Sequence, residues 1–344
     1  MSIFIQGVGV VSPAGWGVNS IRDALAKGAS LPIAELARPG WKLPLPFRPV
    51  PAPVERPAYL SHSRLRRTSP ISQFVVGAAL EALGDDQPRL AEGSLRLGII
   101  VCVMAGCVRY SRRFYEEVCR DPRTASPLVF PETVFNAPAS HLAAVLGSGD
   151  VSYTLVGDPG MFLVGLALGA SWLSAGHVEG CLVVGAEESD WLISDASRRF
   201  ERRVVLAEGA GAVYLRASSA PGPAIALECV TDAHSFTPDR PRARAAAAMR
   251  AQLPQGAAPD LLCDGTRGQA QSDAAEEEAW AHWPGARLSV KRILGESWAA
   301  GSAWQCVAAA DALRTGRHRS ALVSVVGCNQ QAIGLHLGMN PGDP

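Results

Sequence analysis

The stretch GDPGMF, Gly157–Phe162, lies between an apolar run, Val151–Val156 (VSYTLV), and the small-residue helix pattern LVGLALGASWLSAG. This succession predicts a sharp strand-to-helix turn. A nucleophile at such a turn gains from the free N–H groups and the dipole of the helix N-terminus. Pro159 has neither a nucleophilic atom nor an N–H group. With Asp158 as N-cap and Pro159 at the first helical position, the turn is instead well built as structure.

The alternation of buried strand and Ala/Gly-rich helix continues outward from this turn through the whole chain. It includes the strand patterns LRLGIIVCVMAG and GCLVVGAEESD before residue 218, and PDLLCDGT and SALVSVVGCNQ after it. Such alternation predicts an α/β protein whose parallel strands are covered on both faces. The same alternation of strands and helices in both parts of the chain indicates an internal duplication. We therefore predict an N-terminal half, residues 1–218, and a C-terminal half, residues 219–344.

Residues 31–59 interrupt this pattern with a dense series of prolines. Proline at this density excludes a helix or a central strand, so we expect an extended surface arm. Its apolar residues favour contact with the body of the protein over contact with a neighbour.

Composition narrows the functional classes. The 344 residues are 48% hydrophobic and carry 32 basic and 32 acidic side chains, which gives no reason to expect nucleic acid or an anionic membrane as partner. No apolar run reaches the roughly 18–20 residues that span a bilayer, and the N-terminus lacks signal-peptide features. The eight cysteines form no CxxC pair, so we expect buried reduced thiols and a cytoplasmic protein. We expect no metal site and no cofactor.

Six motifs, in order and at consistent spacing, resemble the β-ketoacyl synthases of the thiolase fold over nearly the whole chain. They are GVGVVSPAG, FPETVFNAPASHLAAVLG, VVGAEES, LAEGAGAVYL, DLLCDGTRGQAQSDAAEEEA and SVKRILGESWAAGSA. The resemblance implies a duplicated α/β fold layered α-β-α-β-α, with two mixed five-stranded sheets.

In that family a cysteine at a helix N-terminus takes the acyl chain, and two histidines and a lysine assist decarboxylation. Transferred position by position, the cysteine falls on Pro159, the first histidine on Asp264 of DGTRG, and the second on Glu296 of KRILGES. The lysine is retained as Lys291. SVVGCNQQ, residues 324–331, occupies the place of the family's gating loop. The resemblance thus implies that the catalytic triad has been lost, and we expect no catalytic residue and no activity of the chain alone.

An inactive chain that keeps the whole fold resembles a chain-length factor of type II polyketide, polyene or fatty-acid-like elongation. Such a subunit forms a heterodimer with an active ketosynthase, shapes its acyl tunnel, and meets the acyl carrier protein only indirectly. The resemblance implies a dimer strand formed by Ser152, Tyr153, Thr154, Leu155 and Val156. It implies tunnel or interface positions at Val129, Phe130, Pro131, Thr133, Val134, Phe135, Asn136, Tyr110, Phe114 and Tyr115.

Two alternatives remain open from the sequence. One is a stand-alone thiolase-fold acyltransferase or decarboxylase that uses Lys291, Asp264 and Glu296, with the two carboxylates facing each other. The other is a homodimeric scaffold that binds a carrier protein. Neutralisation of the two carboxylates by Lys291 or by nearby N–H groups is favoured over acid–base chemistry. The chain is also shorter than typical family members, and its proline-rich arm has no counterpart there.

Overall fold

The strands form one large mixed sheet and a separate three-stranded sheet in the computed structural model, which describes residues 2–148, 150–218, 222–254 and 260–340. The large sheet has the strand order β13-β12-β14-β15-β10-β1-β9-β7-β5-β6. Its first-half strands are β1 (Phe4–Ser12), β5 (Leu97–Val103), β6 (Val151–Val156), β7 (Gly180–Glu187) and β9 (Gly209–Arg216). Its second-half strands are β10 (Ala224–Val230), β12 (Leu261–Asp264), β13 (Ala286–Ser289), β14 (Ser320–Val326) and β15 (Gln331–Asn340).

The two halves repeat one topology. In the first, β5 runs parallel to β6 and β7, and β9 is antiparallel to both β7 and β1. In the second, β12 runs parallel to β13 and β14, and β15 is antiparallel to both β14 and β10. The two expected five-stranded sheets are therefore present. They are joined into one hydrogen-bonded sheet by a short antiparallel contact between β1 and β10. The predicted boundary after residue 218 stays a prediction, since residues 219–221 lie outside the described residues.

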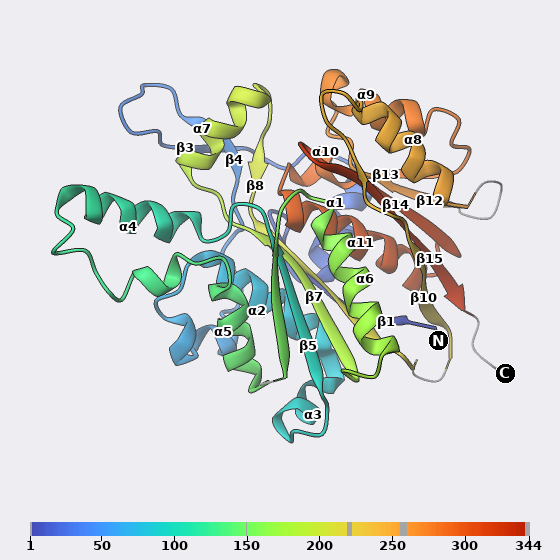
Figure 1. Cartoon of the computed structure of the whole chain (residues 1–344), viewed down its shortest axis with the longest axis horizontal. Coiled ribbons are helices and arrows are strands. Elements are labelled where there is room, and N and C mark those ends of the chain that lie inside the picture. The colour runs from blue at the N-terminus through green and yellow to red at the C-terminus, as the bar shows by residue number, and fades with distance from the viewer. Residues whose placement is uncertain (1, 149, 219–221, 255–259, 341–344) are drawn as a thin grey trace.

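Helices form the remaining layers (Figure 1). The helices α6 (Met161–Ser174) and α11 (Trp298–Arg314) share one core with both sheet halves. The opposite face of the first half is covered by α2 (Pro70–Leu83) and α5 (Ala137–Leu146). In the second half the corresponding cover is α8 (Arg242–Gln252) and α9 (Ala270–Ala279). This is the predicted α-β-α-β-α layering.

Burial explains why these segments adopt these elements. All seven residues of β5, LGIIVCV, are buried, because alternate side chains face the α6–α11 core and the α2–α5 core. The helix α11 is mostly apolar and is buried from Trp298 to Leu313, as expected for a helix packed between two sheets. At Gly7 in β1, a Cβ atom would overlap the carbonyl oxygen of Ala82, so the glycine permits α2 to approach the sheet closely.

The proline-rich arm lies on the body. It forms the hairpin β3 (Ala34–Leu36) and β4 (Leu45–Arg48), and β4 pairs with β8 (Leu206–Ala207). Leu45 and Phe47 are buried, whereas Trp41 and Leu43 are exposed. These short strands lie outside the large sheet, which is compatible with the prolines between them.

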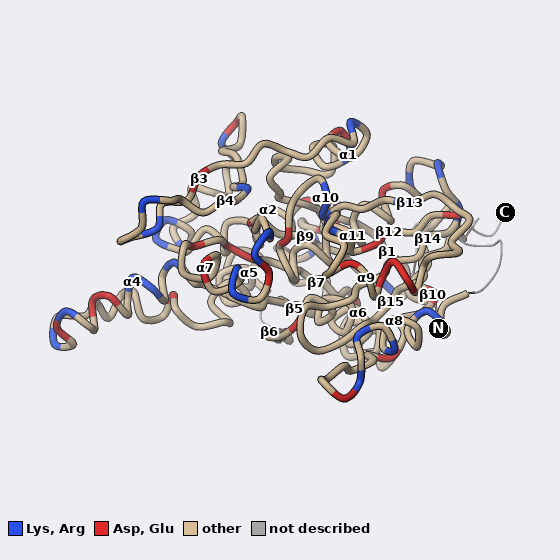
Figure 2. Tube along the Cα trace, turned by 90° about the horizontal axis from the view of Figure 1, so that it is seen from above, with Lys and Arg blue, Asp and Glu red and all other residues tan. Residues whose placement is uncertain are grey.

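The remaining elements connect or extend these layers. They are β2 (Gly15–Trp16), α1 (Val18–Lys27), α3 (Gln87–Ala91), α4 (Val108–Arg120), α7 (Trp191–Phe200), β11 (His234–Ser235), α10 (Val290–Leu294) and the short 3-10 helices η1 (Ala58–Ser61), η2 (Ser63–Leu65), η3 (Gly84–Asp86) and η4 (Phe130–Glu132). The helix α4 projects from the body and carries both basic and acidic residues along its length (Figures 1 and 2). Within the described ranges, no helix has the length and apolar character needed to cross a membrane.

Candidate functional site

The turn at Pro159 lies where β6 ends and α6 begins, as predicted. Pro159 is buried, and the N-cap of α6 is Gly160, which makes no side-chain capping bond. The expectation that Asp158 caps this helix is therefore wrong. The helix begins after Gly160, two residues beyond Asp158, so the Asp158 carboxylate is free to make other contacts.

That carboxylate binds the loop 327–331, which follows β14 and ends with Gln331, the first residue of β15. Oδ1 accepts hydrogen bonds from the backbone N–H groups of Cys328 at 3.0 Å and Asn329 at 3.2 Å. Oδ2 accepts from those of Gln330 at 3.3 Å and Gln331 at 3.1 Å. The Cys328 Sγ also lies 3.1 Å from Oδ1. The residue before Pro159 thus holds a buried carboxylate that accepts hydrogen bonds from four backbone N–H groups.

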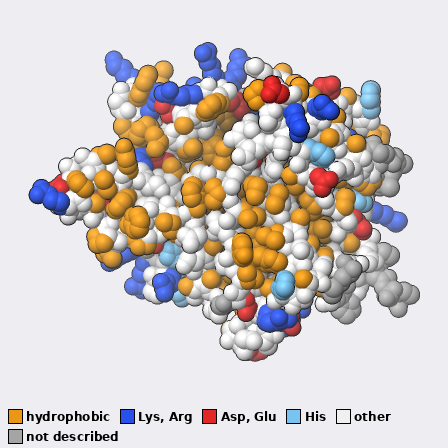
Figure 3. Space-filling model, viewed as in Figure 1, with side chains coloured by type: hydrophobic (Ala, Val, Ile, Leu, Met, Phe, Trp, Pro, Cys, Tyr) orange, Lys and Arg blue, Asp and Glu red, His pale blue; other side chains and the backbone are white. Residues whose placement is uncertain are grey.

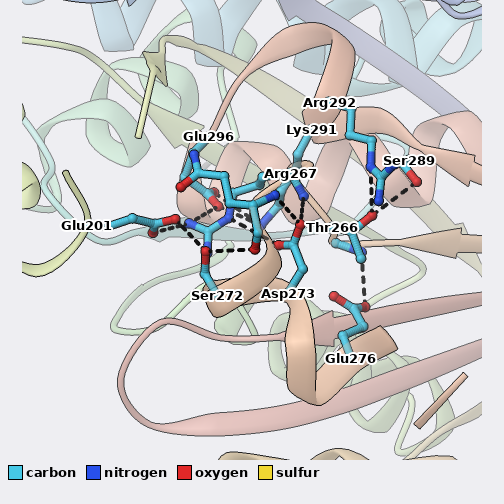
Figure 4. Close-up of polar contacts among 12 residues, drawn as sticks. Glu201, Thr266, Arg267, Ser272, Asp273, Glu276, Ser289, Lys291, Arg292 and Glu296 are labelled. Atoms are coloured by element: carbon cyan, nitrogen blue, oxygen red, sulfur yellow. Dashed lines mark hydrogen bonds and ion pairs between the residues drawn. The ribbon is translucent and has the colours of Figure 1, made fainter. Parts of the chain in front are cut away.

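Glu296 and the retained Lys291 form a buried ion pair (Figure 4). Lys291 Nζ lies 3.1 Å from the Glu296 carboxylate, which also accepts a hydrogen bond from the Trp298 N–H at 2.8 Å. Arg267 Nη1 lies 3.4 Å from the other carboxylate oxygen. Burial by itself raises the pKa of Glu296, but Lys291 and Arg267 together hold it below its ordinary value. Glu296 is therefore an anion fixed between two cations.

Arg267 connects this pair to two further acidic groups. Its Nη1 lies 2.6 Å from the carboxylate of Glu201, the residue that follows α7, and its Nε lies 3.8 Å from Asp273 on α9. Burial lowers the pKa of Arg267, but the three carboxylates together raise it. The Ser272 hydroxyl completes the cluster by donating to Glu201 at 2.7 Å.

Asp264, at the end of β12, has different partners. Its Oδ1 accepts from the Thr266 hydroxyl at 2.7 Å and from the Thr266 N–H at 3.1 Å. Its charge also acts on Glu276 of α9, whose pKa is raised to about 7, first by burial and then by Asp264. Asp264 and Glu296 thus belong to two separate hydrogen-bonded groups, in contrast to the face-to-face pair that we expected.

Trp298 fills apolar space beside the ion pair. It packs with Val204 and Leu206, and Met104 and Cys328 lie against the same cluster. Its φ of 38° is in the left-handed region, which is costly for a bulky residue and marks a position that the surrounding structure must hold in place.

The polar side chains of this site are buried or half-buried, and hydrogen bonds and ion pairs satisfy their charged groups. Pro159 supplies no nucleophile. Asp264 is bound by Thr266, and Glu296 is paired with Lys291 and Arg267. Sequence reasoning missed Arg267, Glu201, Asp273, Glu276 and Cys328. Arg267 had a readable signal, because this cation lies in the same stretch, DGTRG, as Asp264, three residues further along the chain. Glu201 had none, since it lies in the basic run SRRFERR and turns inward only in the fold.

The predicted tunnel and interface residues lie on a projecting segment formed by α4, η4 and the residues up to 136. Phe114 and Phe130 contact each other with ring centroids 5.4 Å apart. Val129 is buried, and 55% of Phe130 is exposed. The others are exposed or half-buried: Tyr110, Tyr115, Pro131, Thr133, Val134, Phe135 and Asn136. On the face that Figure 3 shows, apolar side chains gather over the projecting segment at the left and over the centre of the molecule.

The predicted dimer strand, β6, is the outer strand of the first half. It pairs with β5 on one side, and its other side has no strand partner among the described residues. Tyr153 is 52% exposed and Val156 is 47% exposed. Ser152 is also exposed, whereas Thr154 and Leu155 are half-buried. An exposed apolar edge strand is a template for pairing with another chain.

Comparison with known proteins identifies the fold of this chain from solved structures. No protein-family model matches the sequence, and no curated protein does. Among solved structures, the neighbours are ketosynthase-like proteins of the thiolase fold. The chain has this ketosynthase fold.

The similarity spans nearly the whole chain at low sequence identity. The ishigamide ketosynthase/chain length factor has a TM-score of 0.81 and 20% identity, covering 98% of this chain and 99% of that one. A type II polyketide ketosynthase bound to the hexaketide, in complex with its acyl carrier protein, has a TM-score of 0.77 and 13% identity, with coverages of 98% and 99%. The oxazolomycin ketosynthase domain of Streptomyces albus JA3453 has a TM-score of 0.78 and 16% identity, covering 100% of this chain and 75% of that one.

Proposed function

We propose that this chain is a non-catalytic ketosynthase-like subunit, a chain-length factor, that pairs with an active ketosynthase and shapes its acyl tunnel. One observation carries the proposal: Pro159 lies at the turn between β6 and α6, where the resemblance places the nucleophile, in a chain that has the ketosynthase fold. The ion pair between Glu296 and Lys291 also supports the proposal. The two side chains neutralise each other, whereas a catalytic group would need a free lone pair or proton.

The surface supports a protein partner. The strand β6 leaves an apolar edge uncovered, and the segment with Phe114 and Phe130 adds exposed aromatic area on a projecting helix. Large apolar areas of this kind mark interfaces. In the proposed complex, β6 pairs with a strand of the ketosynthase, and the residues around Phe130 line its tunnel.

The same proposal assigns the cellular setting. The complex elongates acyl chains in the cytoplasm, and the acyl carrier protein reaches this subunit through the ketosynthase. The similarity to a ketosynthase/chain length factor supports the pairing with a ketosynthase.

Native mass spectrometry of the protein, expressed alone and with its ketosynthase, tests the proposal. We expect a one-to-one heterodimer that extends an acyl chain by two carbons from malonyl carrier protein, with release of CO2, whereas neither subunit does so alone. A stable homodimer that ignores the ketosynthase contradicts it. Turnover of acyl thioesters by that homodimer would favour the stand-alone enzyme, and its absence would favour the carrier-binding scaffold.

A further inference from the structure

The loop 327–331 forms a nest of donors that an anion can fill. The N–H groups of residues 328–331 all donate to the Asp158 carboxylate, two to each oxygen. Successive backbone N–H groups that converge in this way make an anion-binding concavity. In this chain the anion is part of the protein, and Asp158 is only 1% exposed.

Close packing shows that the loop and the Asp158 turn fit each other. A Cβ atom on Gly327 would overlap Asp158 Oδ2, and one on Gly160 would lie 2.8 Å from Gln331 Nε2. The Gly327 N–H donates to the Gln331 carbonyl at 2.9 Å, which closes the loop on itself. The glycines therefore allow the loop to lie directly on the turn.

The loop is also held from the opposite side. Arg242 donates to the Gly327 carbonyl, and the Phe236 N–H donates to the Gln330 carbonyl at 2.8 Å. Cys328 packs against the Trp298 cluster. Because so many backbone hydrogen bonds hold this short loop, we expect the loop to open slowly.

We propose that Asp158 is an internal plug: its carboxylate fills the anion nest of the loop 327–331 and keeps that loop closed over the degenerate site, which excludes carboxylate or acyl-carbonyl groups from outside. The plug rests on the non-catalytic role proposed above, because an acyl site in use would have to open here. In the proposed subunit, the Asp158 contact would thus block the site in addition to the missing nucleophile.

Hydrogen exchange of the full-length protein, followed by mass spectrometry, tests the plug. In the wild-type protein we expect the amides of residues 328–331 to exchange as slowly as those of the buried strand β14. In Asp158→Ala their exchange rises about tenfold or more, since local opening sets the rate. The control Asp190→Ala removes another buried carboxylate, the N-cap of α7, and should leave exchange in the loop unchanged.

A small carboxylate supplies the second readout. Formate should enter the space left in Asp158→Ala and restore slow exchange, with no effect on the wild-type protein. If Asp158→Ala fails to fold, Asp158→Asn keeps the side-chain volume, and we expect faster exchange that formate does not reverse, because the amide still fills the nest.

The plug is overturned by rapid wild-type exchange in the loop, by unchanged exchange in both Asp158 variants, or by failure of formate to act on a folded Asp158→Ala. None of these results depends on a ketosynthase partner. Slow wild-type exchange together with a stable homodimer that is inactive and ignores the ketosynthase would instead contradict the proposed function and leave the plug in place.

Discussion

At the scale of single residues, the degenerate site shows how charges replace catalytic groups. The resemblance placed a histidine position on Glu296 and the lysine on Lys291, and the structure pairs these two side chains. Glu296 and Lys291 are both buried, so each depends on the other for compensation. Arg267 then extends the pair into a network that reaches Glu201 across the two halves.

Replacing Glu296 with glutamine should destabilise the protein by about 3–5 kcal/mol, because it leaves the Lys291 ammonium buried without a counter-charge. Unfolding midpoints in urea would measure the effect. The control Glu116→Gln breaks a more exposed ion pair with Arg112 and should cost no more than about 1 kcal/mol.

The double variant Lys291→Met/Glu296→Gln should recover much of the lost stability, since it removes both charges of the pair. If Glu296→Gln alone costs no more than the surface control, the pair is not the structural element that we describe.

At the scale of elements, α4 with η4 and the strand β6 expose apolar surface while the other strands of the first half are largely buried. The projecting segment holds its aromatic pair through local contacts, including the bond from the Ser111 hydroxyl to the Thr133 carbonyl at 3.2 Å. It can therefore present bulky side chains to a partner without rearrangement of the core.

Phe130→Ala should lengthen the products of the proposed complex, because removing a bulky side chain from an apolar tunnel wall opens volume. Phe114→Ala should act in the same direction, since it removes the ring that supports Phe130. Mass spectrometry of the products measures the change. The control Phe200→Ala removes an aromatic ring that is 93% exposed at the end of α7. An unchanged profile from both variants, with the complex intact, counts against the tunnel assignment.

Val156→Asp should weaken the heterodimer, because it places an unpaired charge on the edge strand that we propose as the contact. The matched control is Leu192→Asp on α7, where the side chain is 46% exposed, close to the 47% of Val156. Native mass spectrometry of both complexes compares them. Equal heterodimer fractions would mean that β6 is not the contact strand.

At the scale of the whole molecule, the duplicated fold buries carboxylates in both halves. Burial raises the pKa of Glu187, at the end of β7, to about 8, and that of Glu276 in the second half is raised to about 7. In the unfolded chain both return to an ordinary value near 4.5. Between pH 4.5 and about 8, the folded state therefore holds protons that the unfolded state has released. The free energy of unfolding falls as the pH rises through this range.

Glu276→Gln should reduce this pH dependence, because the amide cannot ionise, and should gain stability relative to the wild type at a pH of about 8 rather than about 5. Urea midpoints at the two pH values provide the measurement. The exposed neighbour Glu278→Gln on the same helix is the control. A wild-type slope retained in Glu276→Gln would show that another group dominates.

The sequence by itself determined the layered α/β fold, the strand-to-helix turn that contains Pro159 and the absence of a nucleophilic atom in that side chain. Strand and helix periodicity are local, and a missing atom can be read from one letter. Only the tertiary structure decided the partners of the buried charges. Asp158 was predicted to cap α6, and it binds a loop 170 residues further along the chain, because a carboxylate takes whichever buried donors the fold brings within reach. Glu201 and Arg267 meet for the same reason, since contacts between distant segments follow from how layers pack and leave no local pattern in the sequence.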